Sequence, residues 1–148
     1  KSFITGNDLD MYRYSGKFTP NKKMIGTWAW AVWPAPKNQK EVDSCINNWL
    51  KHRRGKDATK VEKSKDTLLL SAGGKVSKSG YYRGYFWSGD RLIGVDDDEA
   101  LKLVVKTIDG YDFLIVERGG FNAKPNTDET KEIPKDWHCG YHIYIRQK

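Results

Sequence analysis

The decapeptide MIGTWAWAVW, residues 24–33, decides the fold of this chain. Aromatic and β-branched residues favour extended backbone, so we predict the first β-strand here. Proline follows at positions 34 and 36. Because proline cannot donate a hydrogen bond to a neighbouring strand, we expect the strand to stop at these two residues.

A basic residue near the other end of the chain complements this strand. Alternate residues of a strand share one face, so Gly26, Trp28 and Trp30 point to the same side. Arg146 lies in the last predicted strand, near residues 139–147. A guanidinium above an indole face gains about 0.5–2 kcal/mol, depending on desolvation. Contact between Arg146 and Trp28 would therefore join the two ends of the chain and close the sheet.

The Gly26-x-Trp28 motif with Arg146 resembles the signature of the calycins, the superfamily of lipocalins and their relatives. In that superfamily the tryptophan lies at the closed end of an antiparallel β-barrel, and the basic side chain packs across its ring. The resemblance implies that Gly26, Trp28 and Arg146 close a barrel. It names no ligand.

A second segment, TIDGYDFLIVE at residues 107–117, is similar to small bacterial lipocalin-like domains of poorly characterised function. Gly119-Gly120-Phe121 and a closing strand of aliphatic and basic residues continue the similarity, which covers about residues 24–33 and 85–148. Such domains occur alone and as modules of membrane sensor-type metallopeptidases and sigma-factor-like regulators. One fold hosts many functions, so the resemblance implies architecture more than activity.

Length and composition predict a single soluble domain of 148 residues, with residues 1–22 as an N-terminal arm and 24–148 as the barrel. No apolar run reaches the length of a membrane span. Residue 1 is Lys and no signal-peptide pattern is present, so we expect a mature form or an excised piece. The net charge of +7 favours anionic partners or serves solubility. The oligomeric state stays open.

One amphipathic helix is predicted at residues 38–54. Its apolar residues recur at intervals of three and four: Val42, Cys45, Ile46, Trp49 and Leu50. Basic residues at 51–54 complement the negative end of the helix dipole, and Gly55 is a plausible cap. We expect this stripe to cover the outside of the barrel.

Short strands separated by close turns make up the rest of the prediction. They lie at residues 67–71, 75–87 with a bend near Gly80 or Gly84, 91–95, 100–108, 111–118 and 139–147. Asp109-Gly110 is a strong hairpin signal. The predicted fold class is mainly β: an antiparallel up-and-down, lipocalin-like β-barrel with one α-helix packed outside.

Strand parity suggests what lines the barrel. If Arg146 meets Trp28 inside, His142 and Tyr144 also face inward, and Ile143 and Ile145 face the helix. The interior would then form a cavity able to orient a small, partly apolar or aromatic ligand. The candidate ligand-binding residues are Trp30, Tyr111, Phe113, Glu117, His142 and Tyr144. The alternative is that these aromatics are solid core.

Whether the Glu117 side chain is buried depends on the same strand parity. If the face that it shares with Tyr111 and Phe113 is inward, its carboxylate is buried. It must then pair, for example with Arg91 or Arg146, or its pKa must rise.

The sequence favours a non-catalytic role: binding of such a ligand in the barrel, or a sensing or interaction role for the same module. It lacks the motifs of serine hydrolases, zinc proteases, phosphate loops and dinucleotide-binding folds. Acid–base chemistry by His142, Tyr144 and Glu117 is the enzymatic alternative. We expect no cofactor. We also expect no metal site, because His138 and His142 would lie about 13 Å apart along a strand. The acidic run at 96–99 lacks the spacing of a calcium loop.

Two other binding roles stay open. Exposed aromatic rings at Trp33, Tyr81 and Tyr82 would suit a glycan. The basic region at residues 51–56, with the aromatics at 81–87, would suit single-stranded nucleic acid, although the sequence holds no recognised nucleic-acid module.

The two cysteines, Cys45 and Cys139, fit either two buried free thiols or one disulfide. A disulfide would require an oxidising compartment, and through it the sequence favours a secreted or periplasmic location. No local pattern supports a catalytic cysteine.

Overall fold

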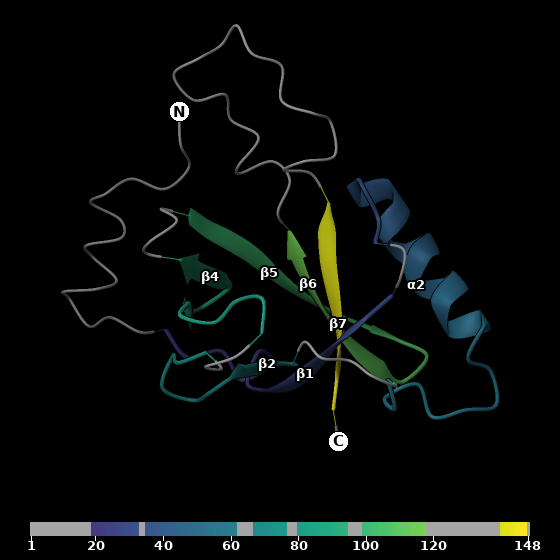
Figure 1. The fold of residues 1–148 in the computed structure, drawn as a ribbon, viewed down its shortest axis with the longest axis horizontal. Coiled ribbons are helices and arrows are strands. Elements are labelled where there is room, and N and C mark those ends of the chain that lie inside the picture. Colours follow the sequence, from purple (N-terminus) through teal and green to yellow (C-terminus); the bar gives the residue numbers. More distant parts are fainter. Residues whose placement is uncertain are drawn as a thin grey trace, which may run out of the picture.

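The computed structural model describes residues 19–32, 35–61, 67–76, 80–94, 99–117 and 140–147. In this part of the chain, seven antiparallel strands form one sheet in the order β2-β1-β7-β6-β5-β4-β3 (Figure 1). The strands are β1 (Gly26–Ala31), β2 (Thr67–Leu70), β3 (Phe86–Ser88), β4 (Arg91–Gly94), β5 (Glu99–Ile108), β6 (Tyr111–Glu117) and β7 (Tyr141–Arg146).

The sheet is an up-and-down barrel that is nearly closed. β3 to β7 follow one another as antiparallel neighbours, β7 pairs with β1, and β1 pairs with β2. Single bridges then join the two outer strands, since Leu70 of β2 pairs with Val76 and Lys75 pairs with Phe86 of β3. This arrangement confirms the predicted fold class.

The helix lies outside the barrel, as the sequence predicted, beside β7 in Figure 1. It is shorter than the predicted range: a 3-10 turn η1 (Gln39–Glu41) leads into α2 (Val42–Lys51). Asn38 caps the start, because its side chain accepts a hydrogen bond from the Glu41 amide at 3.1 Å. At the other end, the amides of residues 52–54 bond back to carbonyls of the last turn.

Two hydrophobic clusters lie on opposite faces of the sheet. The inner one fills the barrel and includes the fully buried Trp28, Trp87, Tyr82 and Tyr144. The outer one joins the buried helix residues to the other face of β6 and β7; its main members are Val42, Ile46, Leu50, Phe113, Ile115, Ile143 and Ile145. The alternation predicted for β7, with Tyr144 inward and its isoleucine neighbours toward the helix, is confirmed.

The hairpin predicted at Asp109-Gly110 is confirmed. β5 and β6 pair from Ile108 and Tyr111 outward, and both turn residues have positive φ angles, 53° and 81°. These angles are those of a type I′ turn, which Asp-Gly accepts at little cost.

The first strand is shorter than predicted. β1 ends at Ala31, one residue before Val32, whose φ of 60° is incompatible with a strand. The strand therefore stops before the prolines. Trp33 and Pro34 lie outside the described residues.

The long strand predicted at 75–87 is wrong. Among the described residues that precede β3, Lys75 and Val76 bridge to other strands, and β3 begins at Phe86. Between them the chain turns at Gly80 and Gly84, whose φ angles are 95° and 84°. Such angles break an extended strand, and the glycines supply them without steric cost. Gly80 and Gly84, which predicted a bend within a strand, instead form turns.

In the described part of the chain, no helix combines the length and the apolar character that crossing a membrane requires.

Candidate functional site

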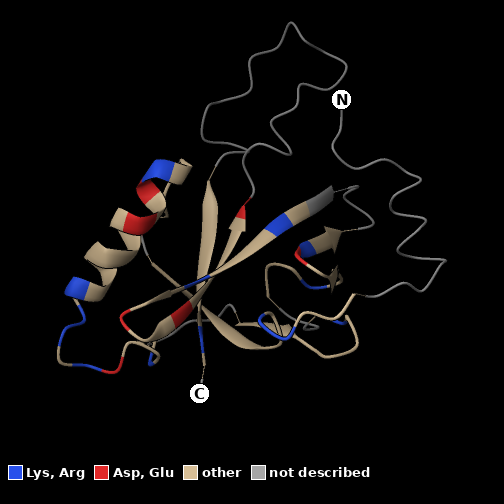
Figure 2. Ribbon diagram, turned by 180° about the vertical axis from the view of Figure 1, so that it is seen from behind, with Lys and Arg blue, Asp and Glu red and all other residues tan. Residues whose placement is uncertain are grey.

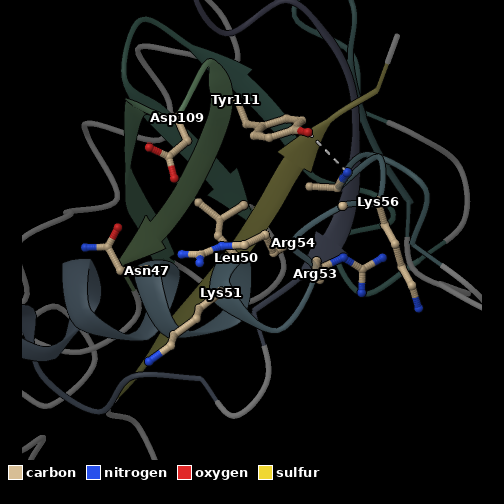
Figure 3. A pocket seen from close by; sticks show the side chains of 10 residues that line it. Asn47, Leu50, Lys51, Arg53, Arg54, Lys56, Asp109 and Tyr111 are labelled. Atoms are coloured by element: carbon tan, nitrogen blue, oxygen red, sulfur yellow. Dashed lines mark hydrogen bonds between the residues drawn. The ribbon is translucent and has the colours of Figure 1, made fainter.

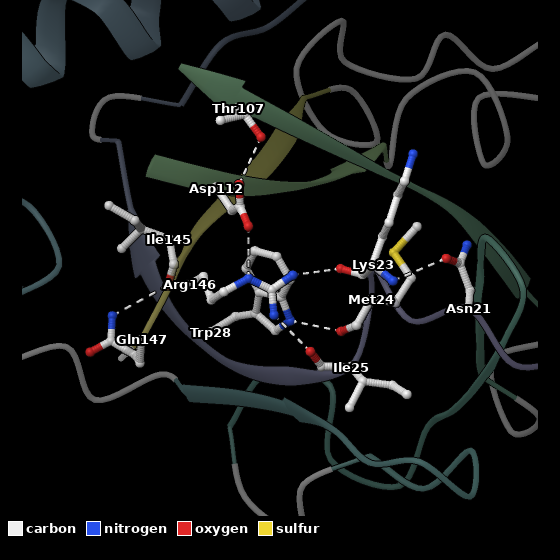
Figure 4. A network of polar contacts seen from close by, with 10 residues as sticks. All are labelled: Asn21, Lys23, Met24, Ile25, Trp28, Thr107, Asp112, Ile145, Arg146 and Gln147. Atoms are coloured by element: carbon white, nitrogen blue, oxygen red, sulfur yellow. Dashed lines mark hydrogen bonds and ion pairs between the residues drawn. The ribbon is translucent and has the colours of Figure 1, made fainter. Parts of the chain in front are cut away.

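Arg146 closes one end of the barrel (Figure 4). Its Cζ lies 4.2 Å from the centre of the Trp28 ring, and the two residues are register partners on β7 and β1. Nη1 donates to the carbonyl of Ile25 at 2.7 Å, and Nη2 donates to that of Lys23 at 2.6 Å. One side chain thus connects the last strand, β7, to the backbone just before the first strand, β1.

Gly26 makes room for this contact. A Cβ at position 26 would lie 2.7 Å from Nη1 of Arg146, and the backbone there has a φ of 144°. Both facts require glycine, because a side chain would collide with the guanidinium and strain the backbone. The Gly-x-Trp motif is therefore explained by the arginine that it accommodates.

Asp112 completes the network from β6. Its carboxylate accepts hydrogen bonds from Thr107 Oγ1 at 2.7 Å and from Arg146 Nε at 3.0 Å. The Thr107 hydrogen bond, helped by the charge and hydrogen bond of Arg146, lowers the pKa of Asp112 below its usual value, although partial burial opposes the shift. Arg146 is fully engaged in this structural role.

An aromatic–histidine cluster lies further along β7, toward the other end of the strands. It consists of Trp30, Tyr81, Tyr82, Tyr85, His142 and Tyr144. His142 lies at its centre, with ring centroids 4.6 Å from Trp30 and 4.9 Å from Tyr81. Its Nδ1 shares a hydrogen bond of 2.7 Å with the hydroxyl of Tyr82.

The cluster runs from the core to the surface. Tyr82 and Tyr144 are buried, Trp30 and His142 are half-buried, and Tyr81 is 55% exposed. The buried members hold the exposed ones in place through edge-on ring contacts, such as Tyr81 on Tyr82 at 5.0 Å. The cluster therefore presents an ordered aromatic surface, with a histidine ring within it, to an incoming molecule.

The turn at residues 80–84 positions the tyrosines. Tyr85 N donates to Tyr82 O at 3.1 Å, and Arg83 N donates to Gly80 O at 3.3 Å, so Tyr81 and Tyr82 lie within a tight turn. Of the three glycan candidates, Tyr81 is exposed, Tyr82 is buried, and Trp33 lies outside the described residues. The sequence prediction missed this turn because it treated the segment as a strand.

Placing Tyr111, Phe113 and Glu117 inside the barrel was wrong. Phe113 pairs with Ile145 and packs in the outer cluster with the helix, and Tyr111 packs beside it. Leu114 and Val116 face the interior instead. Four consecutive residues of β6 are apolar, so the sequence alone could not show which parity faces inward.

Glu117 follows the same parity. It is half-buried and lies between Lys102 and Tyr141 in the register of β5, β6 and β7. The buried carboxylate inside the barrel is therefore not formed, and Arg146 pairs with Asp112. The trio proposed for acid–base chemistry is divided between two faces, since Tyr144 belongs to the inner cluster.

Cys45 is a free, half-buried thiol on α2. Burial, aided by the nearby charge of Glu41, raises the pKa of this thiol, which disfavours the nucleophilic thiolate.

Cys139, His138 and the acidic residues at 96–98 lie outside the described residues. Across the described segments, His, Cys, Asp and Glu form no group of three able to hold a metal ion.

The structure thus brings Trp30, His142 and Tyr144 together at one place and separates them from the Arg146 network. Tyr81, Tyr82 and Tyr85 join them from the turn that precedes β3. A scan against protein-family models and searches of curated proteins and of solved structures found no match to this chain.

Proposed function

We propose that this chain is a non-catalytic, lipocalin-like binding domain that holds a small, partly apolar or aromatic ligand at the aromatic–histidine cluster. The observation that carries the proposal is the continuous ring contact from buried Tyr144, through half-buried Trp30, to the exposed Tyr81. Exposing a large aromatic ring to water forgoes the free energy of burying it, which a ligand that covers the ring recovers.

The cluster offers polar as well as apolar contacts. The Tyr82 hydroxyl and the His142 ring form a hydrogen-bonded pair among the rings. Binding sites of this kind are mostly apolar, and a few placed polar groups orient the ligand. A flat ligand with one polar group suits this combination.

The ligand is expected at the end of the barrel rather than deep inside. Below the cluster, fully buried large side chains, including Trp28 and Trp87, occupy the interior together with leucines of β2, β4, β5 and β6. A deeper position would require these side chains to move, which close-packed interiors resist.

The test uses N-phenyl-1-naphthylamine, a neutral aromatic probe whose fluorescence rises in apolar sites. The full chain should bind it saturably, and Tyr81→Ala and Trp30→Leu should each weaken binding by about tenfold, since each removes a ring worth about 1–2 kcal/mol or more. Leu69→Ala is the matched control, because Leu69 is also an exposed large apolar residue, at 42%. Equal binding by all four proteins would contradict the proposal.

A glycan is the competing ligand class, favoured by the exposed face of Tyr81. It predicts retardation in polysaccharide affinity gels that Tyr81→Ala abolishes, without binding of the naphthylamine. That result would replace the small aromatic ligand by a sugar at the same cluster.

A further inference from the structure

A basic pocket lies on the outer surface where α2 ends (Figure 3). Its volume is about 410 Å³. Its lining includes charged and hydroxyl-bearing side chains, those of Lys51, Arg53, Arg54, Lys56, Asp109 and Tyr111. It is separate from the aromatic–histidine cluster, with which it shares no residue.

The chain builds the pocket by turning sharply after the helix. Arg53 N donates to Leu50 O at 2.9 Å, and Lys56 N donates to Arg53 O at 3.0 Å. Gly55 permits the turn with a φ of 85°. Asp109 of the hairpin turn and Tyr111 of β6 form the opposite side, as Figure 3 shows.

Tyr111 and Leu50 give the pocket an apolar side, and the loop is tied down at this point. The Tyr111 hydroxyl accepts a hydrogen bond from Ala58 N at 3.4 Å. The backbone that carries the basic side chains is therefore held against the barrel.

Arg53 is held in place but is not fully satisfied. Its Cζ lies 4.5 Å from the centre of the Trp49 ring, and its Nη2 donates to Lys60 O at 2.6 Å. Its Nε is buried and has no hydrogen-bond partner among the residues that the structure describes. Buried donors are nearly always paired in proteins, so an unpaired one beside a pocket points to a ligand or water that accepts its hydrogen.

The pocket concentrates positive charge that the described residues do not neutralise. Figure 2 shows basic residues following one another from the end of the helix into the loop. Elsewhere Lys106 pairs with Asp43 at 2.7 Å and Arg146 with Asp112 at 3.0 Å. Within the described segments, none of the four cations of the pocket lies within 4.0 Å of a carboxylate.

The carbonyls at the end of α2 are largely hydrogen-bonded within the chain. The carbonyls of Asn48, Leu50 and Lys51 accept hydrogen bonds from the amides of residues 52, 53 and 54. His52 Nδ1 makes a further contact of 2.8 Å with Asn48 O. Three of the last four carbonyls of α2 are therefore already occupied by donors of the chain itself.

We propose that this pocket binds a small ligand through a phosphate or diphosphate group. Guanidinium groups match phosphate oxygens with paired hydrogen bonds, and lysines add point charges. The volume lies within the range of small-molecule sites, about 300–1,000 Å³. The exposed Asp109 suits a hydroxyl donor on the same ligand. A pocket of this size, bounded by the end of α2, the loop after it and the Asp109 turn, fits a small molecule better than a nucleic-acid strand.

The test measures binding of pyrophosphate to the full chain by calorimetry, in buffer free of phosphate and sulfate. We expect one saturable site that Arg54→Gln and Lys56→Gln each weaken by about tenfold, since each removes charge-assisted contacts. Both side chains are exposed, so these variants should fold. Lys40→Gln is the matched control: it removes the same charge from an exposed position before the other end of α2 and should leave the affinity unchanged.

Asp109→Asn should change the affinity for pyrophosphate in the opposite direction. Asparagine tolerates the φ of 53° at this position, and removing the carboxylate should tighten pyrophosphate binding. Absence of a saturable site, or an equal loss in Lys40→Gln and Arg54→Gln, would overturn the proposal.

Two further experiments identify whether the phosphate belongs to a lipid headgroup or to a soluble molecule. Sedimentation with phosphatidylcholine vesicles that contain phosphatidic acid, lost in Arg54→Gln, would support the phosphate chemistry and assign it to a lipid headgroup. Binding of pyrophosphate without binding to these vesicles would support a soluble phosphate. Retention of a single-stranded oligonucleotide without pyrophosphate binding would overturn the proposal in favour of nucleic acid.

Discussion

At the scale of single residues, Arg146 organises the closed end of the barrel. It stacks on Trp28, donates to two backbone carbonyls and pairs with Asp112. The two backbone contacts join segments more than 100 residues apart, since Arg146 lies 121 positions from Ile25 and 123 from Lys23. The geometry depends on the missing side chain at Gly26.

Gly26→Ala is therefore expected to destabilise the fold by about 1–3 kcal/mol, through backbone strain and displacement of Arg146. Urea unfolding followed by tryptophan fluorescence measures this change. Gly73→Ala is the control, because a Cβ there meets nothing within 4 Å. Equal stability of the two variants would mean that the contact at Gly26 is unimportant.

Asp112 couples the same network to pH. Its pKa is lowered in the folded state, first by the Thr107 hydrogen bond. A lowered folded pKa stabilises the fold above the unfolded value of about 3.9, and this contribution is lost as pH falls through the folded pKa. Asp112→Asn should be less stable than the parent at pH 7, and the difference should shrink between about pH 5 and pH 2. Parallel stability curves over that range would argue against the linkage.

At the scale of elements, α2 is held by its apolar face. Val42, Ile46 and Leu50 are buried against β6 and β7, while the other face carries exposed polar residues. An isolated helix of 10 residues is marginal in water, so packing must supply most of its stability.

Ile46→Ala is expected to cost about 2–5 kcal/mol, because the side chain is fully buried and its removal leaves a cavity. Ser44→Ala, on the exposed face, should change stability by less than about 0.5 kcal/mol. Chemical denaturation of both variants checks this contrast. A small effect of Ile46→Ala would show that the helix is weakly docked.

At the scale of the whole molecule, closure of the barrel is completed away from Arg146. The outer strands β2 and β3 have four and three residues, and Lys75 and Val76 bridge them. Trp87 reinforces this seam, since its amide donates to Gly74 O and its indole donates to Ser71 O, both at 2.8 Å. Short bridged edges leave little unpaired backbone for association with other chains.

The two candidate sites lie on opposite faces of the same sheet. The aromatic–histidine cluster belongs to the inner face, and the basic pocket lies on the outer face beside the helix. Because they share no residues, variants at one site serve as controls for the other.

Local pattern was enough to predict most elements. The apolar stripe of α2, the Asp109-Gly110 hairpin and the alternation in β7 each depend on residues close together in sequence. The prediction failed where local pattern was ambiguous. The aromatic run at 81–87 fits a continuous strand equally well, but positive φ angles at Gly80 and Gly84 make its first part a turn, and β3 begins only at Phe86.

By itself, then, the sequence determined the mainly β fold and the outer helix of the described segments, because side-chain period and turn chemistry are local properties. Tertiary structure alone decided the rest. Which face of β6 turns inward depends on its register with β7, and register is set by pairing across the sheet. The contact of Tyr81 with His142, and the position of Arg54 and Asp109 around one pocket, likewise arise from the packing of distant segments.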